Sequence, residues 1–132
     1  MSQENVEVMR EGIDAWNRDD RDEWLAVFAP DAEWHTTGRF ADRGVYRGRE
    51  ALARYWLEFR EDVEELITSV AEIRAVGDKV LVAATATGRG RRSKAAFGIP
   101  VWFVSTFRDG LVVRVETHDD PEQAFEAVDL GD

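Results

Sequence analysis

The sequence predicts an α+β fold, with helices in the first half of the chain and strands in the second. In the first half, apolar residues recur at steps of three and four, as they do in amphipathic helices. In the second half, apolar runs are separated by Gly77-Asp78 and Asp109-Gly110, two-residue pairs that are typical of β-hairpin turns. We therefore expect two helices, a strand and a third helix, followed by four strands in a meander and a short closing helix.

Three segments have the pattern of helices. The first lies between a cap at Ser2 and a polar break at residues 17–20. The second starts at Asp20, a residue type favoured at helix N-termini, and must end before Pro30. The third runs from about residue 50 to residue 62, with aromatic and aliphatic side chains on one face.

Five segments are rich in β-branched and aromatic residues, which predicts strands. In chain order they are residues 33–37, 66–76, 79–87, 99–107 and 111–117. The three glycines between residues 38 and 48 predict a loop, and residues 121–130 fit a terminal helix with proline in its first turn. A long antiparallel sheet has two faces, and three helices can cover only one, so we expect a pocket where helices and sheet do not meet.

The composition predicts one domain over residues 1–132. Of the residues, 44% are hydrophobic and 11% aromatic, enough for a packed core. The absence of cysteine excludes disulfides, thiolate metal sites and a thiol nucleophile. We see neither a signal peptide nor a long apolar segment in the sequence, so we expect no membrane span and a cytoplasmic location.

The net charge of −10 opposes binding to the phosphate backbone of nucleic acids. The exception is the segment Arg89–Lys94, which carries four cations in six residues. Its glycine and serine indicate a solvated hairpin loop, and no aromatic residue lies between the charges. We therefore expect no nucleic-acid partner.

His35 and His118 are the only histidines, and both lie at the ends of predicted strands. A histidine that is oriented by a carboxylate can act as a general base next to a carbonyl group. His118 has Glu116 two residues before it on the same strand face, and Asp119 directly after it. These four residues are therefore the candidate catalytic set, placed near the mouth of the pocket. The alternative is that both histidines are partly exposed strand-end residues.

The two histidines could also be combined with Asp119 and Asp120 as a metal site. The sequence lacks the local ligand spacing of known metal motifs, such as two histidines one helical turn apart. We therefore expect neither a metal nor a cofactor.

Several aromatic residues lie on segments that are expected to face inward. They could form the wall of a pocket for a flat apolar ligand, or they could simply pack the core. These candidate ligand-binding residues are Trp16, Trp34, Tyr55, Trp56, Phe59 and Trp102.

Five short motifs follow one another along the chain: residues 15–20 (AWNRDD), 28–34 (FAPDAEW), 46–52 (YRGREAL), 107–110 (FRDG) and 120–127 (DPEQAFEA). In this order they resemble the SnoaL-like group of the nuclear transport factor 2-like (ketosteroid isomerase-like) superfamily. The resemblance implies a cone-shaped barrel of a curved, mixed but mainly antiparallel sheet, packed against three N-terminal helices with a short C-terminal helix. The superfamily contains isomerases, epoxide hydrolases, polyketide cyclases and non-catalytic binding modules, so it leaves the function open.

The resemblance also shows which catalytic groups this chain lacks. The base of ketosteroid isomerases would fall on Thr36, their oxyanion-hole tyrosine on Gly12 and their protonated acid near Phe103. The charged middle-strand pair of limonene-type epoxide hydrolases would fall within residues 83–87, which carry no charge, and their last-strand acid on Glu116 or Thr117. Neither reaction is therefore expected. SnoaL-type polyketide cyclases use a histidine and an aspartate for proton transfer beside a carbonyl group, with the acid near the end of the last strand. The residues that this chain has there, Glu116, His118, Asp119 and Asp120, do not contradict that chemistry.

Two hypotheses follow. The first is a small, cofactor-independent acid–base enzyme of the cyclase or isomerase type, acting on a hydrophobic, carbonyl-containing metabolite. The second is a non-catalytic module of the same fold that binds a small apolar molecule or dimerises. Under either hypothesis we expect a homodimer through the outer face of the sheet, because its strands carry apolar residues that the helices cannot fully cover. These residues are Val80, Val82, Val101, Val113 and Val115.

Overall fold

The computed structural model describes residues 2–36 and 44–129, and its elements follow the predicted order with one addition. The elements are α1 (Ser2–Asn17), α2 (Arg21–Ala26), β1 (Phe28–Thr36), β2 (Val45–Arg47), α3 (Gly48–Asp62), β3 (Val63–Val76), β4 (Lys79–Gly90), β5 (Ala96–Arg108), β6 (Leu111–His118) and α4 (Pro121–Asp129). The sequence analysis missed β2, a strand of three residues inside the expected loop. Residues 38–43 of that loop and residue 37 of the first predicted strand lie outside the described residues.

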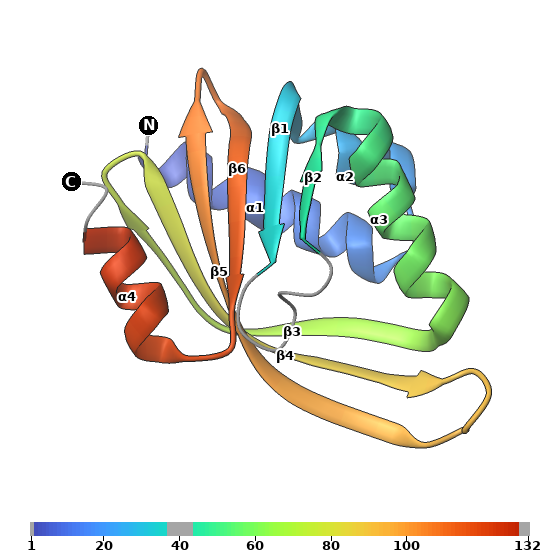
Figure 1. Cartoon of the computed structure of the whole chain (residues 1–132). Helices are drawn as coiled ribbons and strands as arrows, with labels where there is room; N and C mark the ends of the chain where they lie inside the picture. The colour runs from blue at the N-terminus through green and yellow to red at the C-terminus, as the bar shows by residue number, and fades with distance from the viewer. Residues whose placement is uncertain (1, 37–43, 130–132) are drawn as a thin grey trace.

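The strands form one six-stranded sheet in the order β2-β1-β6-β5-β4-β3. The consecutive strands from β3 to β6 form the predicted antiparallel meander. β1 then pairs in parallel with β6, and β2 pairs antiparallel with β1. The sheet is curved and its two edges do not meet (Figure 1), so the expected cone is an open sheet and not a closed barrel.

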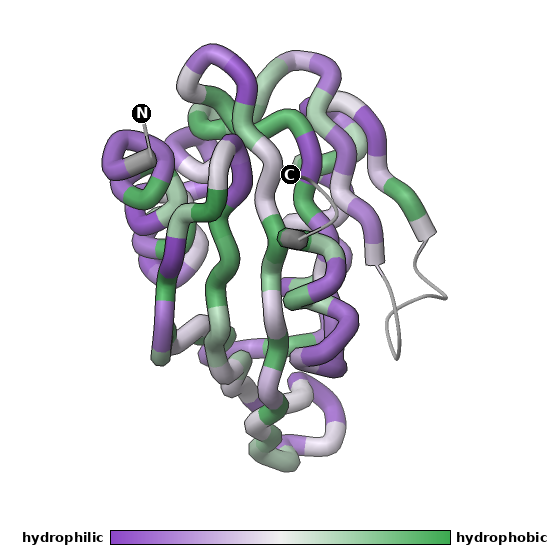
Figure 2. The backbone as a smooth tube through the Cα atoms, turned by 90° about the vertical axis from the view of Figure 1, so that its left-hand side faces the viewer, coloured by the Kyte–Doolittle hydropathy of each residue, from purple (hydrophilic) through white to green (hydrophobic). Residues whose placement is uncertain are grey.

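Helices cover the two faces of this sheet unequally. α1, α2 and α3 pack on one face, which we call the inner face, and α4 lies on the opposite, outer face (Figure 1). Because successive side chains of a strand point to opposite faces, Val80 and Val82 belong to the inner core while Leu81 packs with Ala124 and Val128 of α4. Hydrophobic stretches accordingly run along the strands, and the helices carry hydrophilic ones (Figure 2).

This arrangement corrects the argument for an apolar outer face. Four of the five valines on which that argument rested belong to the inner core, with at most 4% of their surface exposed. The prediction placed them on the wrong side, because the helices cover more of the strands than expected. These valines are Val80, Val82, Val101 and Val115.

Local signals position the ends of the helices. Asp20 caps α2 as predicted, since its side chain accepts a hydrogen bond from the backbone N–H of Glu23 at 3.2 Å. At the end of α1, the Asn17 side-chain amide pairs with the edge strand β3. Its Nδ2 donates to the Thr68 carbonyl at 2.9 Å, and its Oδ1 accepts from the Thr68 N–H at 2.8 Å. Asn17 therefore satisfies the backbone N–H and carbonyl of one residue at the open edge of the sheet.

The basic loop at the tip of the β4–β5 hairpin is paired within the chain. Arg89 Nε lies 3.3 Å from Glu65 Oε2, and Lys94 Nζ lies 2.7 Å from Glu64 Oε1, a contact that lowers the pKa of Glu64. Arg91 Nε donates to the Arg60 carbonyl at 2.6 Å. These contacts favour the interpretation of the segment as a solvated hairpin loop.

Among the described residues, none of the helices combines the length and hydrophobicity that crossing a bilayer requires.

We predict that Asn17→Ala lowers the free energy of unfolding by about 1–3 kcal/mol, because it leaves the N–H and carbonyl of Thr68 without their partner. Urea denaturation followed by circular dichroism measures this change. Asn5→Ala, the same substitution at the other end of α1, is the control and should change the stability by less than about 0.5 kcal/mol. Equal effects of the two substitutions would contradict the role given to Asn17.

Candidate functional site

A cavity of about 110 Å³ lies between the helices and the inner face of the sheet. A single water needs only about 10–15 Å³, so the cavity has room for a small organic molecule. α1 contributes Met9, Ile13 and Trp16 to its wall, and α3 contributes Tyr55 and Phe59. The floor comes from alternate residues of the strands, such as Phe97, Ile99, Val101 and Phe103 of β5.

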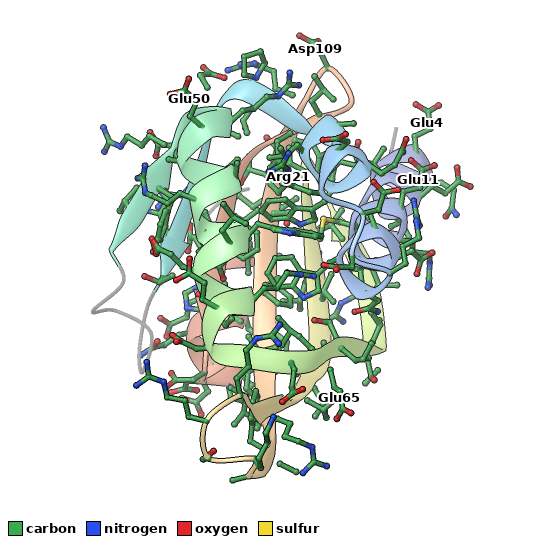
Figure 3. All side chains as sticks on the ribbon, turned by 90° about the vertical axis from the view of Figure 1, so that its right-hand side faces the viewer. Glu4, Glu11, Arg21, Glu50, Glu65 and Asp109 are labelled. Carbon is green, nitrogen blue, oxygen red and sulfur yellow. The ribbon has the colours of Figure 1, made fainter. Side chains whose placement is uncertain are left out.

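The wall of this cavity is apolar. Its lining residues that carry a polar group are three threonines, Thr36, Thr68 and Thr117, together with Tyr55 and the tryptophans. Within the described part of the chain, no Asp, Glu, His, Lys or Arg lines it. Charged side chains lie on the outside instead, where the labelled glutamates of α1 and α3 point away from the molecule (Figure 3). Such an interior suits a neutral molecule, because a buried charge without a partner is costly.

Four of the six aromatic residues predicted for the wall lie on it: Trp16, Trp34, Tyr55 and Phe59. Trp102 does not, because its neighbours Val101 and Phe103 face the cavity and Trp102 must then face outward, where it packs beside α4. Trp56 also lies away from the cavity. Its position in the wall and that of Trp102 were therefore predicted wrongly, and ligand binding by the other four stays a prediction.

Trp56 is instead covered by Arg60 of α3. The guanidinium carbon of Arg60 lies 3.5 Å from the ring centroid of Trp56 and 4.4 Å from that of Trp16. Arg60 also donates to Asp19 Oδ1 and to the Trp16 carbonyl, both at 2.6 Å. Burial lowers the pKa of Arg60. These contacts join α3 to the end of α1 and hold Trp16 in the wall of the cavity.

The two histidines lie on the outer face of the sheet, away from the cavity. Trp34 and Thr36 of β1 face the cavity, and so does Thr117 of β6; the residues between and beside them therefore face outward. His35 and His118 are among these, so their predicted place at the mouth of the cavity is wrong.

The outer face nevertheless brings the predicted catalytic residues together. His35 is in register with Glu116 of the neighbouring strand. His118 Nε2 lies 3.1 Å from Glu116 Oε1, the predicted orienting contact, and His35 Nε2 lies 2.7 Å from Glu33 Oε1. Asp119 lies in the bend between β6 and α4. In the described ranges, no three acidic or histidine side chains converge as metal ligands would.

The carboxylates of this outer cluster are stabilised in their charged form. The hydrogen bond from His118, together with Arg114 Nε at 3.0 Å, lowers the pKa of Glu116 to about 2, although burial opposes the shift. The hydrogen bond with His35 and the charge of Arg47 lower the pKa of Glu33. Both glutamates are therefore ionised at neutral pH and serve as acceptors for the two imidazoles.

The family resemblance located the cavity better than the histidines did. Thr36, Gly12 and Phe103, the positions where the catalytic groups of ketosteroid isomerases would fall, all line the cavity. They present a hydroxyl, a hydrogen atom and a phenyl ring, and none of these is an acid or a base near neutral pH. The strand residues of the floor were not predicted, although the alternation from Phe97 to Phe103 is the signal that could have found them.

Comparison with known proteins agrees with this architecture. Residues 9–115 match the model of the SnoaL-like domain. An NTF2-like protein from Burkholderia xenovorans is 32% identical, and its structure matches with a TM-score of 0.76 over 97% of this chain and 98% of that chain. Among curated proteins, none matches this sequence.

Two more distant structures share the fold and contain small molecules. A protein with a ketosteroid isomerase-like fold from Catenulispora acidiphila, in complex with trimethylamine, is 16% identical with a TM-score of 0.77, over 85% of this chain and 84% of that chain. TerC, co-crystallised with polyporic acid, is 19% identical with a TM-score of 0.80, over 96% of this chain and 98% of that chain.

We predict that Glu116→Gln destabilises the protein at neutral pH but not in strong acid. The folded-state pKa of about 2 lies below the ordinary 4.5, so the stabilisation is complete above pH 4.5 and is lost as the pH falls toward 2. At neutral pH the variant should lose about 1–2 kcal/mol of unfolding free energy, a figure reduced for partial solvent exposure. Denaturant titrations at neutral pH and at or below about pH 2 measure the difference.

Glu126→Gln on the exposed side of α4 is the matched control and should change the stability by less than about 0.5 kcal/mol at either pH. A loss at Glu116 that stays constant across the acid range would show that the carboxylate charge is not its cause.

Proposed function

Because the chain belongs to the SnoaL-like domain family, we propose that it binds a small, neutral, largely apolar molecule in the cavity between α1, α3 and the sheet. The observation that carries this proposal is the composition of the wall, which has aromatic and aliphatic side chains and, in the described residues, no charged one. Burial of apolar surface then supplies the binding free energy. The trimethylamine and polyporic acid complexes of two proteins with this fold support a binding role for the same scaffold.

The acid–base hypothesis depends on residues that lie elsewhere. His118, Glu116 and His35 are on the outer face, separated from the cavity by the sheet itself. Catalysis by these groups and Asp119 on a hydrophobic, carbonyl-containing metabolite therefore requires a substrate that binds outside the cavity. Their catalytic roles stay a prediction, and the proposal made here assigns them none.

A substitution that fills the cavity tests the proposal. Ala86 of β4 lines the cavity, and the side chain of its neighbour Thr85 is exposed on the opposite face. Ala86→Phe should weaken the binding of indane, a neutral bicyclic hydrocarbon, by roughly tenfold or more, because the new ring occupies the space. Isothermal titration calorimetry measures the affinity.

Thr85→Phe adds the same ring on the other side of the strand and should leave the affinity within about twofold of the wild type. Unchanged affinity in folded Ala86→Phe protein, or absence of indane binding to the wild type, would contradict the proposed site.

The homodimer through the outer face is also part of the proposal. In place of the valines, its support is Val45 of β2, which is 47% exposed and lies in register with His35 of the outer face. Sedimentation equilibrium at micromolar concentration should give a mass near twice 15.0 kDa. Val45→Asp should shift the mass toward the monomer, because it buries an unpaired carboxylate in the interface.

Leu57→Asp, at a position 50% exposed on α3, is the control and should remain dimeric. A mass near 15.0 kDa for the wild-type protein would contradict the dimer.

A further inference from the structure

We propose that Trp34 donates a hydrogen bond from its indole Nε1 to a neutral acceptor oxygen of the molecule in the cavity. This inference rests on the proposed function and specifies the class of ligand: a mainly hydrocarbon skeleton that carries a carbonyl or ether oxygen.

The first observation is a buried donor without an acceptor. Trp34 lines the cavity and exposes only 7% of its surface. Its Nε1 is buried and has no hydrogen-bond partner among the described residues. Buried tryptophan N–H groups usually find a partner, because an unsatisfied donor costs free energy comparable to a lost hydrogen bond. An acceptor oxygen on the ligand would remove that cost.

The second observation is that the indole is held in place. Its ring centroid lies 4.7 Å from that of Tyr55, 6.0 Å from that of Trp24 and 6.1 Å from that of Phe103. Its backbone lies in the interior of the sheet, in register with Tyr46 on one side and Val115 on the other. The ring therefore cannot swing toward a distant acceptor without breaking these contacts. An acceptor must therefore approach the indole, and the cavity, whose wall includes Trp34, is the space from which a ligand would do so.

The third observation concerns the charge of that acceptor. The described lining contains no cation, so a carboxylate or phosphate in the cavity would be a buried charge without a partner. A pure hydrocarbon would leave Nε1 unsatisfied. A neutral carbonyl or ether oxygen accepts the hydrogen bond and needs no counter-ion.

The competing explanation is that the aromatic faces of Tyr55 or Phe103 already accept the N–H. Such N–H···π contacts are weak, and they would give the ligand's oxygen no advantage. Two probes of nearly equal shape separate the explanations: 1-indanone, which has one ketone oxygen, and indane, which has none.

The wild-type protein should bind 1-indanone roughly five- to tenfold more tightly than indane, as measured by calorimetry. Trp34→Phe keeps an aromatic ring but removes the donor, so it should bind the two probes with affinities within about twofold of each other. Trp102→Phe, the same substitution on the outer face, should retain the wild-type preference.

A spectroscopic measurement on the wild-type protein makes the result independent of any variant. In ¹⁵N-labelled protein, the indole N–H resonance of Trp34 should move downfield when 1-indanone is added and should not do so with indane.

Equal affinities of the wild type for the two probes, or a preference that persists in Trp34→Phe, would overturn the hydrogen bond and leave the proposed function standing. Failure of both probes to bind would overturn the proposed function and the hydrogen bond together.

Discussion

The alternation of side chains along the strands decides which chemistry the cavity contains. In β1, Trp34 and Thr36 face inward, and Glu33 and His35 lie on the other side. β6 repeats the pattern in register, with Thr117 inside and Glu116 outside. A shift by one residue would exchange the two sets, so the sheet register alone keeps the interior apolar and collects the ionisable groups on the outer face. The apolar cavity and the polar outer cluster are thus two consequences of one backbone geometry.

The cavity also depends on how α1 is held. Asn17 ties the end of this helix to the backbone of β3, and Arg60 of α3 covers Trp16 one residue earlier. Both contacts act at one point, where the helix would otherwise fray, so the ring of Trp16 is fixed from two sides. Stiff aromatic side chains that are held in this way cannot collapse into the remaining space, because rings pack well only in a few geometries. The hydrogen bonds of Asn17 and the stacked guanidinium of Arg60 therefore help to keep the apolar cavity open.

The fold could be predicted from the sequence to a greater extent than the site. Periodicity gave the helices and the meander, and the acidic residue at position 20 gave the cap of α2. The short strand β2 has too few residues to show a period. Trp102 was assigned inward because its segment was expected to face the core, whereas the alternation of Val101 and Phe103 excludes this. His118 was harder, because Thr117 on the inner face is itself polar, and hydropathy therefore does not distinguish the two sides of β6.

The parallel pairing of β1 with β6 also has a consequence for how the chain acquires its structure. The Thr117 hydroxyl reaches the carbonyl of His35, which is 82 positions earlier in the chain. Closing so long a segment costs entropy before any contact repays it, and such non-local pairs slow folding. During synthesis, the edge of β1 that pairs with β6 stays unpaired until β6 has left the ribosome. Exposed edges of this kind attract other strands, so the interval before β6 arrives is when the nascent chain is most exposed to aggregation and to chaperones.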